Sequence, residues 1–267
     1  MRYFKAKNRD EALEHLNENP SDYLFCGGTD LALKLKRSSV DGVIDISALD
    51  EFDFIHVDSY EIKIGALTTI SSILESEDIK QHLPILHDAC SSFASHQIRN
   101  IATIGGNIAN DSPVADMIAP LLVLRTTVTL GGLDKERTIP LEELFDGFKH
   151  LTLKNEIIIS LNIPLQKHQY YYRKVGSREK LNISKLSLAM LKNEDGFFMS
   201  GASVNPYITR FFNLEKLLNS AEVDDSKILD TLQKDISPSG SFRSTKEYRV
   251  KVMFNMIKDA LKSFEVE

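Results

Sequence analysis

Apolar and polar residues follow helical and strand periods in turn along the first fifty residues. Residues 10–17 carry apolar side chains on one helical face, and Asn19-Pro20 follows as a stop signal. Residues 23–26 read as a short buried strand, 31–36 as a helix and 43–46 as a second strand. Because a right-handed crossover would place these strands side by side, we expect them to be parallel.

Further along the chain, a strict alternation predicts a hairpin. Residues 54–57 and 61–64 alternate around Asp58-Ser59-Tyr60. Thr68 and Thr69 are suited to cap a helix that runs to Leu74. Residues 84–95 have apolar positions at mixed helical spacing. This part of the chain is therefore expected to mix strands and helices.

The C-terminal third carries strands first and helices afterwards. Residues 128–130 and 157–163 read as strands, Pro164 ends the second, and the polar residues 166–169 follow as a connector. The remaining expected strands are 186–191 and 197–204, and the expected helices are 212–218, 227–232 and 246–261. Such an order predicts a separate α+β domain over 166–267, after a first domain over 1–165.

Composition narrows the class of protein. With 267 residues, 42% hydrophobic and 26% charged, the chain has the make-up of a globular protein of one or two domains. The net charge of -6 is scattered, which argues against a nucleic-acid binder. We find no apolar run of the roughly 20 residues that a membrane span needs, and no signal peptide, so a cytoplasmic location is expected.

Only two cysteines, Cys26 and Cys90, are present. Two thiols cannot hold an iron-sulfur cluster through four thiolates, and their spacing matches no metal-ligand pattern. Cys26 lies in an apolar run, where a small buried side chain is the more common role. We therefore assign no metal site to this chain, and any such cluster belongs to another chain.

Two glycine pairs are the candidate chemistry. Gly27-Gly28-Thr29-Asp30 lies between an expected strand and an expected helix, so its unobstructed amides can turn toward an anion such as a phosphate. Asp30 is assigned first to capping that helix. A second segment, 103–107, reads as another glycine loop, with hydroxyl and amide side chains. Either pair alone is commonly an ordinary turn.

Common catalytic motifs are missing from the sequence. Neither glycine pair has the three spaced glycines of the dinucleotide fingerprint, and no glycine segment ends in Gly-Lys-Ser or Gly-Lys-Thr. There is also no His-Glu-Xaa-Xaa-His zinc pattern and no Gly-Xaa-Ser-Xaa-Gly nucleophile turn. We assign no catalytic side chain.

The residues around both glycine pairs resemble the FAD-binding subunit of the xanthine dehydrogenase and carbon monoxide dehydrogenase family of molybdenum hydroxylases. The first block is Leu24-Phe25-Cys26-Gly27-Gly28-Thr29-Asp30-Leu31, and the second is 102–110 followed by Ser112-Pro113-Val114-Ala115-Asp116. The likeness continues through 156–160 and 172–178 into 241–249, and so covers essentially the whole chain. One departure is Phe25-Cys26, where many relatives carry small or branched residues.

This resemblance implies a fold and a cofactor site. The fold is α+β: two α/β subdomains, about 1–53 and 54–165, form a FAD-binding region of the type shared with vanillyl-alcohol oxidase-like flavoproteins, and a C-terminal α+β domain of antiparallel sheet and helices follows. The amides of both glycine segments would hold the FAD pyrophosphate, and Asn107 and Asp116 its hydroxyl-bearing part. The residues that the resemblance assigns to FAD binding are Leu24, Phe25, Cys26, Gly27, Gly28, Thr29, Asp30, Leu31, Phe93, Thr103, Ile104, Gly105, Gly106, Asn107, Asp116, Ile158, Arg173 and Lys174.

Several of these residues also have a simpler interpretation. Phe93 and Ile158 fit ordinary core positions equally well. Arg173 and Lys174 have the composition of solvated surface charges. Asp116 follows Ser112-Pro113 and is suited to cap an apolar segment that begins at Met117.

The resemblance further implies an electron relay. FAD in this chain would take electrons from [2Fe-2S] clusters on a small partner subunit, while a large partner subunit with molybdopterin oxidises the substrate, in a hetero-oligomer. A purine such as xanthine and the acceptor NAD are the leading expectations. Two alternatives remain: a self-contained flavin reductase or oxidase with the same FAD-binding fold, and a flavin-free assembly scaffold.

Overall fold

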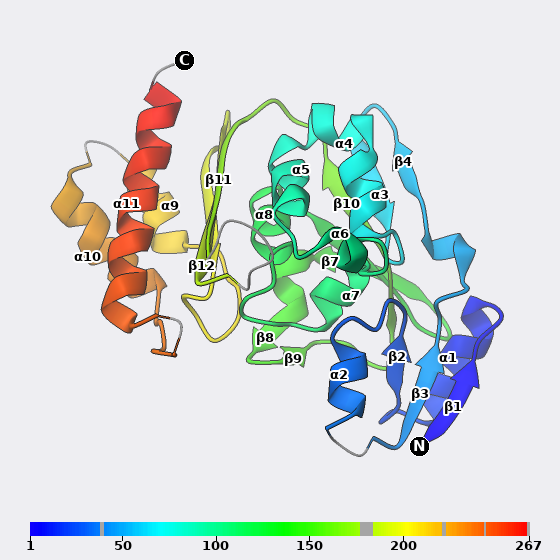
Figure 1. The fold of residues 1–267 in the computed structure, drawn as a ribbon. Helices are drawn as coiled ribbons and strands as arrows, with labels where there is room; N and C mark the ends of the chain where they lie inside the picture. Colours follow the sequence, from blue (N-terminus) through cyan, green and yellow to red (C-terminus); the bar gives the residue numbers. More distant parts are fainter. Residues whose placement is uncertain (38–39, 177–183, 221–222, 243, 266–267) are drawn as a thin grey trace.

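Three sheets of three or more strands follow one another from the N-terminal to the C-terminal end of the described chain. The computed structural model describes residues 1–37, 40–176, 184–220, 223–242 and 244–265. Figure 1 shows the first sheet and the C-terminal helices at opposite ends, with the second sheet and its helices between them. Ser177, Arg178 and Arg243, which belong to the segments that carry the resemblance, lie outside the described residues.

The first sheet is small and parallel. Its strands are β1 (Arg2–Lys5), β3 (Gly42–Asp45) and β2 (Tyr23–Phe25), in that spatial order. The predicted parallel pair, β2 and β3, is confirmed, whereas β1 was not expected. Helix α1 (Arg9–Glu18) begins at Asn8, whose side chain accepts a hydrogen bond from the Glu11 amide. Helix α2 (Leu31–Leu35) follows β2 and buries none of its residues.

The second sheet is antiparallel and has five strands. Their order is β4 (Ile55–Val57), β5 (Glu61–Gly65), β10 (Ile157–Pro164), β6 (Thr127–Gly131) and β7 (Glu136–Pro140). The predicted hairpin is confirmed as β4 and β5, and Pro164 ends β10 as expected. Two short 3-10 helices, η1 (Asp50–Phe52) and η2 (Leu141–Leu144), and a small hairpin of β8 (Phe145–Gly147) and β9 (His150–Leu151) complete this part.

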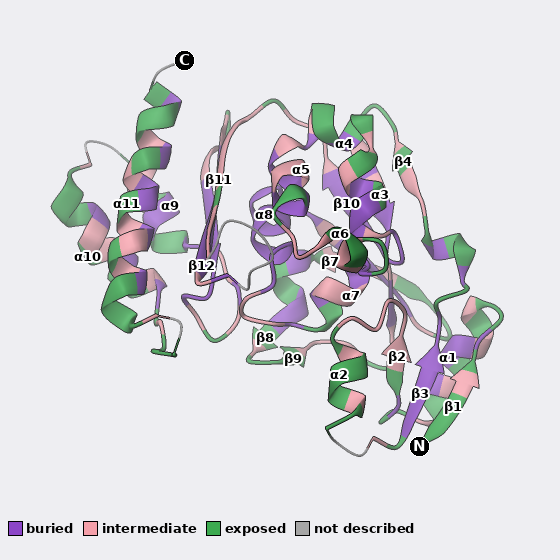
Figure 2. Ribbon diagram, viewed as in Figure 1, coloured by how far each residue is buried: buried purple, intermediate pink, exposed green. Residues whose placement is uncertain are grey.

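Six short helices accompany the second sheet and enclose the main hydrophobic core. They are α3 (Ile70–Glu75), α4 (Glu77–His82), α5 (Pro84–Ser91), α6 (His96–Arg99), α7 (Ile104–Ala109) and α8 (Ile118–Val123). Thr69 caps α3 as predicted, since its hydroxyl accepts from the Ser72 amide at 3.0 Å. Every residue of α8 is buried, which places this helix at the centre of the molecule (Figure 2).

The third sheet stands between two layers of helix (Figure 1). Its antiparallel strands are β11 (Gln169–Val175), β12 (Leu186–Asn193) and β13 (Gly196–Ala202), and the helices after it are α9 (Phe212–Leu218), α10 (Asp225–Asp235) and α11 (Lys246–Glu265). Strands β12 and β13 and the three helices match the expected elements. Strand β11 was not predicted, and Gln169, read as connector, is its first residue.

Strand β11 faces both layers through alternate residues. Tyr170 and Tyr172 pack against the main core, whereas Tyr171 and Val175 pack against the core formed with the C-terminal helices. Successive side chains of a strand point to opposite faces, which explains this division. Lys174 therefore points toward the main core, where its ammonium donates to the carbonyl of Ser92 at the end of α5.

No helix within the described ranges is long and apolar enough to cross a membrane.

Candidate functional site

The two glycine segments lie against one another. A Cβ placed on Gly27 would come within 1.7 Å of the Ile101 carbonyl oxygen, so this close backbone approach requires glycine. Beside it, Cys26 Sγ lies 3.1 Å from the Thr103 hydroxyl. The sequence separates these residues by more than seventy positions, and the fold brings them into direct contact.

Asp30 also joins the two segments, which corrects its predicted role as a helix cap. Its side chain makes no capping hydrogen bond with α2 and instead accepts one from the Asn110 amide group, at the end of α7. Capping needs an extended backbone, and Asp30 has helical angles, φ -105° and ψ -47°. Its carboxylate therefore bridges segments.

The first segment has the geometry of an anion cradle. Gly28 has φ +62°, in the left-handed region that glycine adopts freely. A Cβ there would also come within 2.4 Å of the Phe25 ring. Among the described residues, the amides of Gly27, Gly28 and Thr29 have no hydrogen-bond partner. Consecutive unpaired amides around a left-handed residue form a concave site for a phosphate.

The second segment is a helix rather than the glycine loop that the sequence suggested. Helix α7 includes both glycines, and the amides of its first turn are already hydrogen-bonded within the protein, which corrects the expectation that they hold a pyrophosphate. Their acceptors are Thr68 O for Ile104, Ala66 O for Gly105, Thr103 Oγ1 for Gly106 and Thr103 O for Asn107. The amides that remain for an anion are those of the first segment.

The two glycines of α7 have different reasons to lack a side chain. A Cβ on Gly105 would come within 2.7 Å of Ala66, so this glycine permits tight packing. A Cβ on Gly106 would meet only the side chains of Thr103, at 2.8 Å, and Cys26, at 3.4 Å. Gly106 therefore offers smooth backbone beside the cradle of the first segment.

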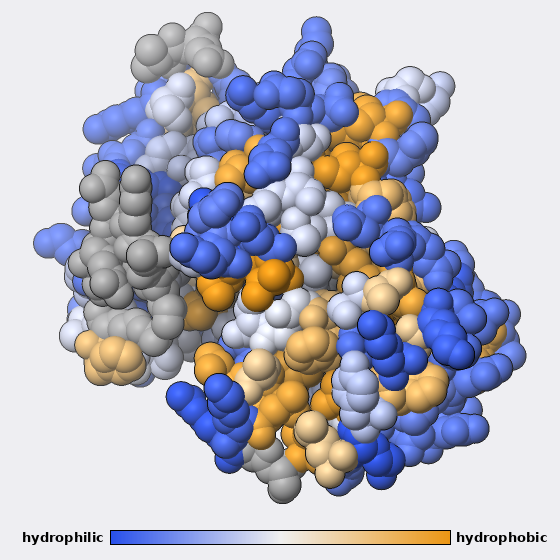
Figure 3. Space-filling view, turned by 45° about the vertical axis from the view of Figure 1, so that its right-hand side comes forward, coloured by the Kyte–Doolittle hydropathy of each residue, from blue (hydrophilic) through white to orange (hydrophobic). Residues whose placement is uncertain are grey.

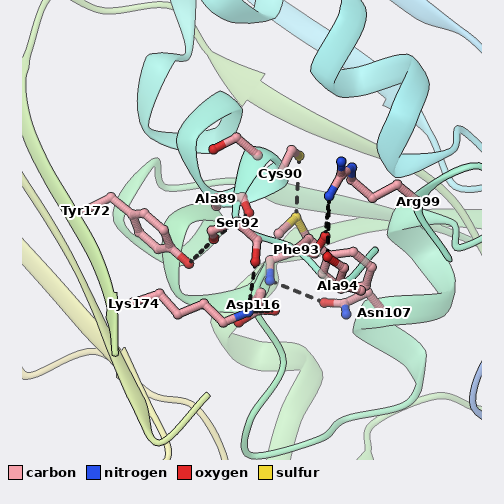
Figure 4. A network of polar contacts seen from close by, with 12 residues as sticks. Ala89, Cys90, Ser92, Phe93, Ala94, Arg99, Asn107, Asp116, Tyr172 and Lys174 are labelled. Carbon is pink, nitrogen blue, oxygen red and sulfur yellow. Dashed lines mark hydrogen bonds and ion pairs between the residues drawn. The ribbon is translucent and has the colours of Figure 1, made fainter. Parts of the chain in front are cut away.

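A buried ion pair joins β11 to the segment before α8 (Figure 4). Lys174 Nζ donates to Asp116 Oδ2 at 2.7 Å, and the two side chains are 8% and 9% exposed. Burial raises the pKa of the Asp116 carboxyl, and the Lys174 ammonium opposes that shift. The capping interpretation of Asp116 is wrong, because Met117 occupies the cap position of α8 and no side chain caps it.

Asp116 and Asn107 together present groups that suit a polyhydroxylated ligand. Asp116 Oδ1 is buried and has no partner among the described residues, so it is an acceptor whose desolvation is uncompensated. Asn107 Oδ1 accepts from the Met117 amide at 3.3 Å, which fixes the orientation of the side chain and of its amide nitrogen, a donor. Hydroxyl groups both donate and accept, and therefore match this pair.

The remaining predicted residues divide between the site and its surroundings. Phe93 is partly buried in the turn after α5 and packs against the main core, and Figure 4 draws it in the same network of residues as Asn107. Ile158 is 6% exposed and belongs to the main core, which favours its structural interpretation. Arg173 lies on the opposite face of β11 from Lys174, where it pairs with Asp259 at 3.2 Å.

The residues Leu24, Thr29 and Leu31 flank the cradle without a polar side-chain contact among the described residues. Leu24 packs in the core of the first sheet, Thr29 is half-buried in the cradle, and Leu31 begins α2. Their contribution to a ligand would come from the backbone.

Sequence reasoning missed two groups that complete the network in Figure 4. Tyr172 points its hydroxyl toward Ser92 Oγ, at 3.5 Å, and burial followed by the charge of Asp116 raises its pKa. Arg99 donates to the Phe93 carbonyl at 2.7 Å. The signal for Tyr172 was its position two residues before Lys174, which puts both on one face of a strand. Within the described ranges, no cluster of three His, Cys, Asp or Glu could hold a metal ion.

Comparisons with known proteins identify the family. The profile described as "FAD binding domain in molybdopterin dehydrogenase" matches residues 1–166. The glyceraldehyde dehydrogenase medium chain of Sulfolobus acidocaldarius is 29% identical, over 94% of this chain and 93% of that protein. The xanthine dehydrogenase FAD-binding subunit of Escherichia coli O157:H7 is 27% identical, over 97% and 94%.

A solved structure shows the same fold. Carbon monoxide dehydrogenase from Hydrogenophaga pseudoflava, at 24% identity, superposes with a TM-score of 0.91 over 98% of this chain and 96% of the compared chain. This chain belongs to the family of FAD-binding domains of molybdopterin dehydrogenases. The resemblance and the FAD cofactor inferred from the sequence are thereby confirmed.

Proposed function

We propose that this chain is the FAD-carrying electron-transfer subunit of a molybdenum hydroxylase complex. The observation that carries the proposal is the pairing, in a member of this family, of backbone amides at Gly27, Gly28 and Thr29 with a buried acceptor at Asp116, all of them without a hydrogen-bond partner among the described residues. The first suits a pyrophosphate and the second a polyol chain, and FAD contains both.

The residues present divide the cofactor between them. The amides of Gly27, Gly28 and Thr29 would hold the pyrophosphate, and the smooth surface of Gly106 would let it approach the backbone. Asp116 Oδ1 would accept from a hydroxyl of the ribityl chain and Asn107 would donate to one. The positive charge of Lys174 stays beside Asp116 through their buried ion pair.

The chemistry belongs to the cofactor. Bound FAD supplies an isoalloxazine ring that takes electrons singly and releases them as a pair. The chain binds and orients it, and the buried ion pair of Asp116 and Lys174 places one cation next to the polyol site. Tyr172 stays a neutral phenol at physiological pH because burial raises its pKa. We assign no general acid or base to the chain.

The partner subunits would hold the other redox groups. In the proposed hetero-oligomer, a large subunit holds molybdopterin and a small subunit holds the [2Fe-2S] clusters that deliver electrons to FAD. The relatives are described as a medium chain and a FAD-binding subunit, which supports a multi-subunit complex. Leu33 and Ile101, both 51% exposed, lie at the glycine segments, and Figure 3 shows hydrophobic patches on one face of the molecule. Exposed apolar surface of this kind favours a protein partner.

We also propose that the complex oxidises xanthine or another purine and passes electrons to NAD. Support for xanthine comes from the Escherichia coli relative. The other relatives act on glyceraldehyde and carbon monoxide, which indicates that this subunit tolerates different chemistry on its partner. The substrate would be set by the molybdenum subunit.

The domain boundaries belong to the same proposal. We propose two subdomains of the vanillyl-alcohol oxidase type, about 1–53 and 54–165, and a C-terminal α+β domain over 166–267. The α/β class that the resemblance implied for 54–165 is corrected to α+β, because every strand pair of its five-stranded sheet is antiparallel. The parallel first sheet, the antiparallel second sheet and the antiparallel third sheet with its three helices fall into these ranges. FAD would then lie between the cradle of the first subdomain and the ion pair that Asp116 of the second subdomain forms with Lys174 of the C-terminal domain.

The test is anaerobic reduction of the flavin. Xanthine, an aldehyde and NADH are added in turn to the FAD-loaded chain alone and to the complex purified with its partners. The proposal expects xanthine or the aldehyde, whichever is the substrate, to bleach the visible flavin absorbance only in the complex. Bleaching of the isolated chain by xanthine or the aldehyde would instead identify a self-contained reductase or oxidase.

A further inference from the structure

The turn after α5 has an unusual backbone conformation. Ala94 has φ +39°, in the left-handed region that a residue with a Cβ rarely adopts. Such a conformation persists only where the surrounding structure holds it, and it is found more often at functional sites than elsewhere. The turn spans Ser92 to Ala94 and carries Phe93, an aromatic residue that Figure 4 draws in the network around Asp116 and Asn107.

Two cationic side chains hold all three carbonyl groups of this turn. Lys174 Nζ donates to Ser92 O at 3.1 Å. Arg99 Nη1 donates to Phe93 O at 2.7 Å and to Ala94 O at 3.5 Å. Because one guanidinium nitrogen donates to two consecutive carbonyls, Arg99 fixes their relative direction. That direction depends on the backbone angles of Ala94, so Arg99 stabilises the left-handed conformation of this residue.

Arg99 is well placed to couple the turn to the second glycine segment. It is the last residue of α6, whose cap is Ser95, and the Ile98 carbonyl accepts from the Ala102 amide at 2.8 Å immediately before Thr103. Through these bonds the guanidinium is tied to the start of α7. Asn107 lies on that helix, so Arg99 sets the position of Phe93 relative to Asn107.

The surroundings of Arg99 favour a positioning role over general stabilisation. Among the described residues it forms no ion pair within 4.0 Å, and its Nε is buried without a partner. An arginine whose role is stability alone gains most from a carboxylate partner, which would pair its guanidinium in two places. Here the charge is directed at two carbonyls of one strained turn.

We propose that Arg99 is a positioning residue for the flavin site: it holds Ala94 in its left-handed conformation so that Phe93 is presented to the bound cofactor. This inference rests on the proposed FAD site. Arg99 would act on the cofactor through Phe93 and not through a contact of its own. Arg99 would affect FAD by setting the direction of the Phe93 side chain. A change at Arg99 should therefore alter the affinity for FAD and the circular dichroism of the bound flavin.

The experiment measures FAD binding by the full chain and the visible circular dichroism of the bound flavin. Arg99→Gln removes the charge, and we expect affinity for FAD to fall about tenfold, as for the loss of one charge-assisted hydrogen bond, with an altered dichroism spectrum. Arg99→Lys keeps the charge but lacks the planar fork, and an intermediate loss is expected. Arg125→Gln, at an exposed arginine, is the matched control and should change neither.

Ala94→Gly supplies the decisive second variant. Glycine adopts the left-handed conformation freely, so Ala94→Gly in the Arg99→Gln background should recover at least about threefold of the lost affinity and part of the dichroism. Unchanged FAD affinity and dichroism in folded Arg99→Gln would overturn the inference. So would a loss in Arg99→Gln that Ala94→Gly leaves wholly unrecovered. A wild-type chain that binds no FAD would instead overturn the proposed function, which separates the two failures.

Discussion

The buried pair of Lys174 and Asp116 gives the sharpest test of the site's electrostatics. Replacing Lys174 by Met keeps the length of the side chain and removes its charge, which leaves Asp116 buried without its partner. With side chains only 8% and 9% exposed and 2.7 Å apart, the loss is expected to cost about 3 to 5 kcal/mol of unfolding free energy, the range for one broken buried pair.

The same change should make stability depend on pH. Burial already raises the pKa of Asp116 and Lys174 opposes this, so removing Lys174 raises the pKa further. A carboxyl with a raised folded pKa holds a proton that the unfolded chain releases. Stability therefore falls as pH rises from the ordinary Asp pKa of about 3.9 toward the folded pKa, by up to about 1.4 kcal/mol per pH unit. The Lys174→Met penalty should be smaller at pH ~5 than at pH ~8.

Urea denaturation of the cofactor-free chain, followed by circular dichroism, measures both effects. Lys174→Met with Asp116→Asn should recover most of the loss, because no unpaired charge then remains. Arg125→Met is the matched control: it breaks an exposed pair with Asp195, at 2.6 Å, and should cost less than about 1 kcal/mol. If Lys174→Met cost no more than Arg125→Met, Lys174 and Asp116 would not form a buried, coupled ion pair.

Two further predictions concern other groups. Burial raises the pKa of Asp111 to about 6. Asp111→Asn should therefore stabilise the chain by about 2 to 3 kcal/mol above pH ~6 and have no effect on stability below pH ~4. Urea denaturation measures this difference, and equal shifts of the urea midpoint at both pH values would contradict it. Cys26 is half-buried between the glycine segments, whereas burial raises the pKa of Cys90 to about 12. Mass spectrometry should therefore show iodoacetamide on Cys26 alone, with added FAD slowing it, and labelling of Cys90 at the same rate would be inconsistent with the packing.

The elements with a clear apolar period could be predicted, and those defined by packing could not. The hairpin of β4 and β5 and helix α9 alternate or repeat as their geometry demands, and they form as expected. Strand β11 could not be predicted because both of its faces are covered. Tyrosines point to both faces, so the sequence shows no alternation of apolar and polar residues. Helix α7 could not be predicted because it contains two glycines, which disfavour a helix. One of them, Gly105, is required by its tight packing on Ala66.

The candidate site was predictable in its residue types but only partly in its bonding. Family likeness located Asp116 and Lys174, but their contact depends on the fold of β11 against α5, which no local pattern encodes. The family likeness also assigned Arg173 to the FAD site together with Lys174. Neighbouring residues of a strand point to opposite faces, and Arg173 pairs with Asp259 instead. Arg99 gave no signal, because its partners are backbone carbonyls whose direction depends on one left-handed alanine.

The central claim is that the cradle and the Asp116 group hold FAD, and cofactor content tests it most directly. The purified full chain is saturated with FAD, freed of excess by gel filtration and denatured, and the released flavin is identified and quantified against protein. We predict one FAD per chain. A folded chain that remains colourless and takes up no added FAD would contradict the account and favour a flavin-free assembly scaffold.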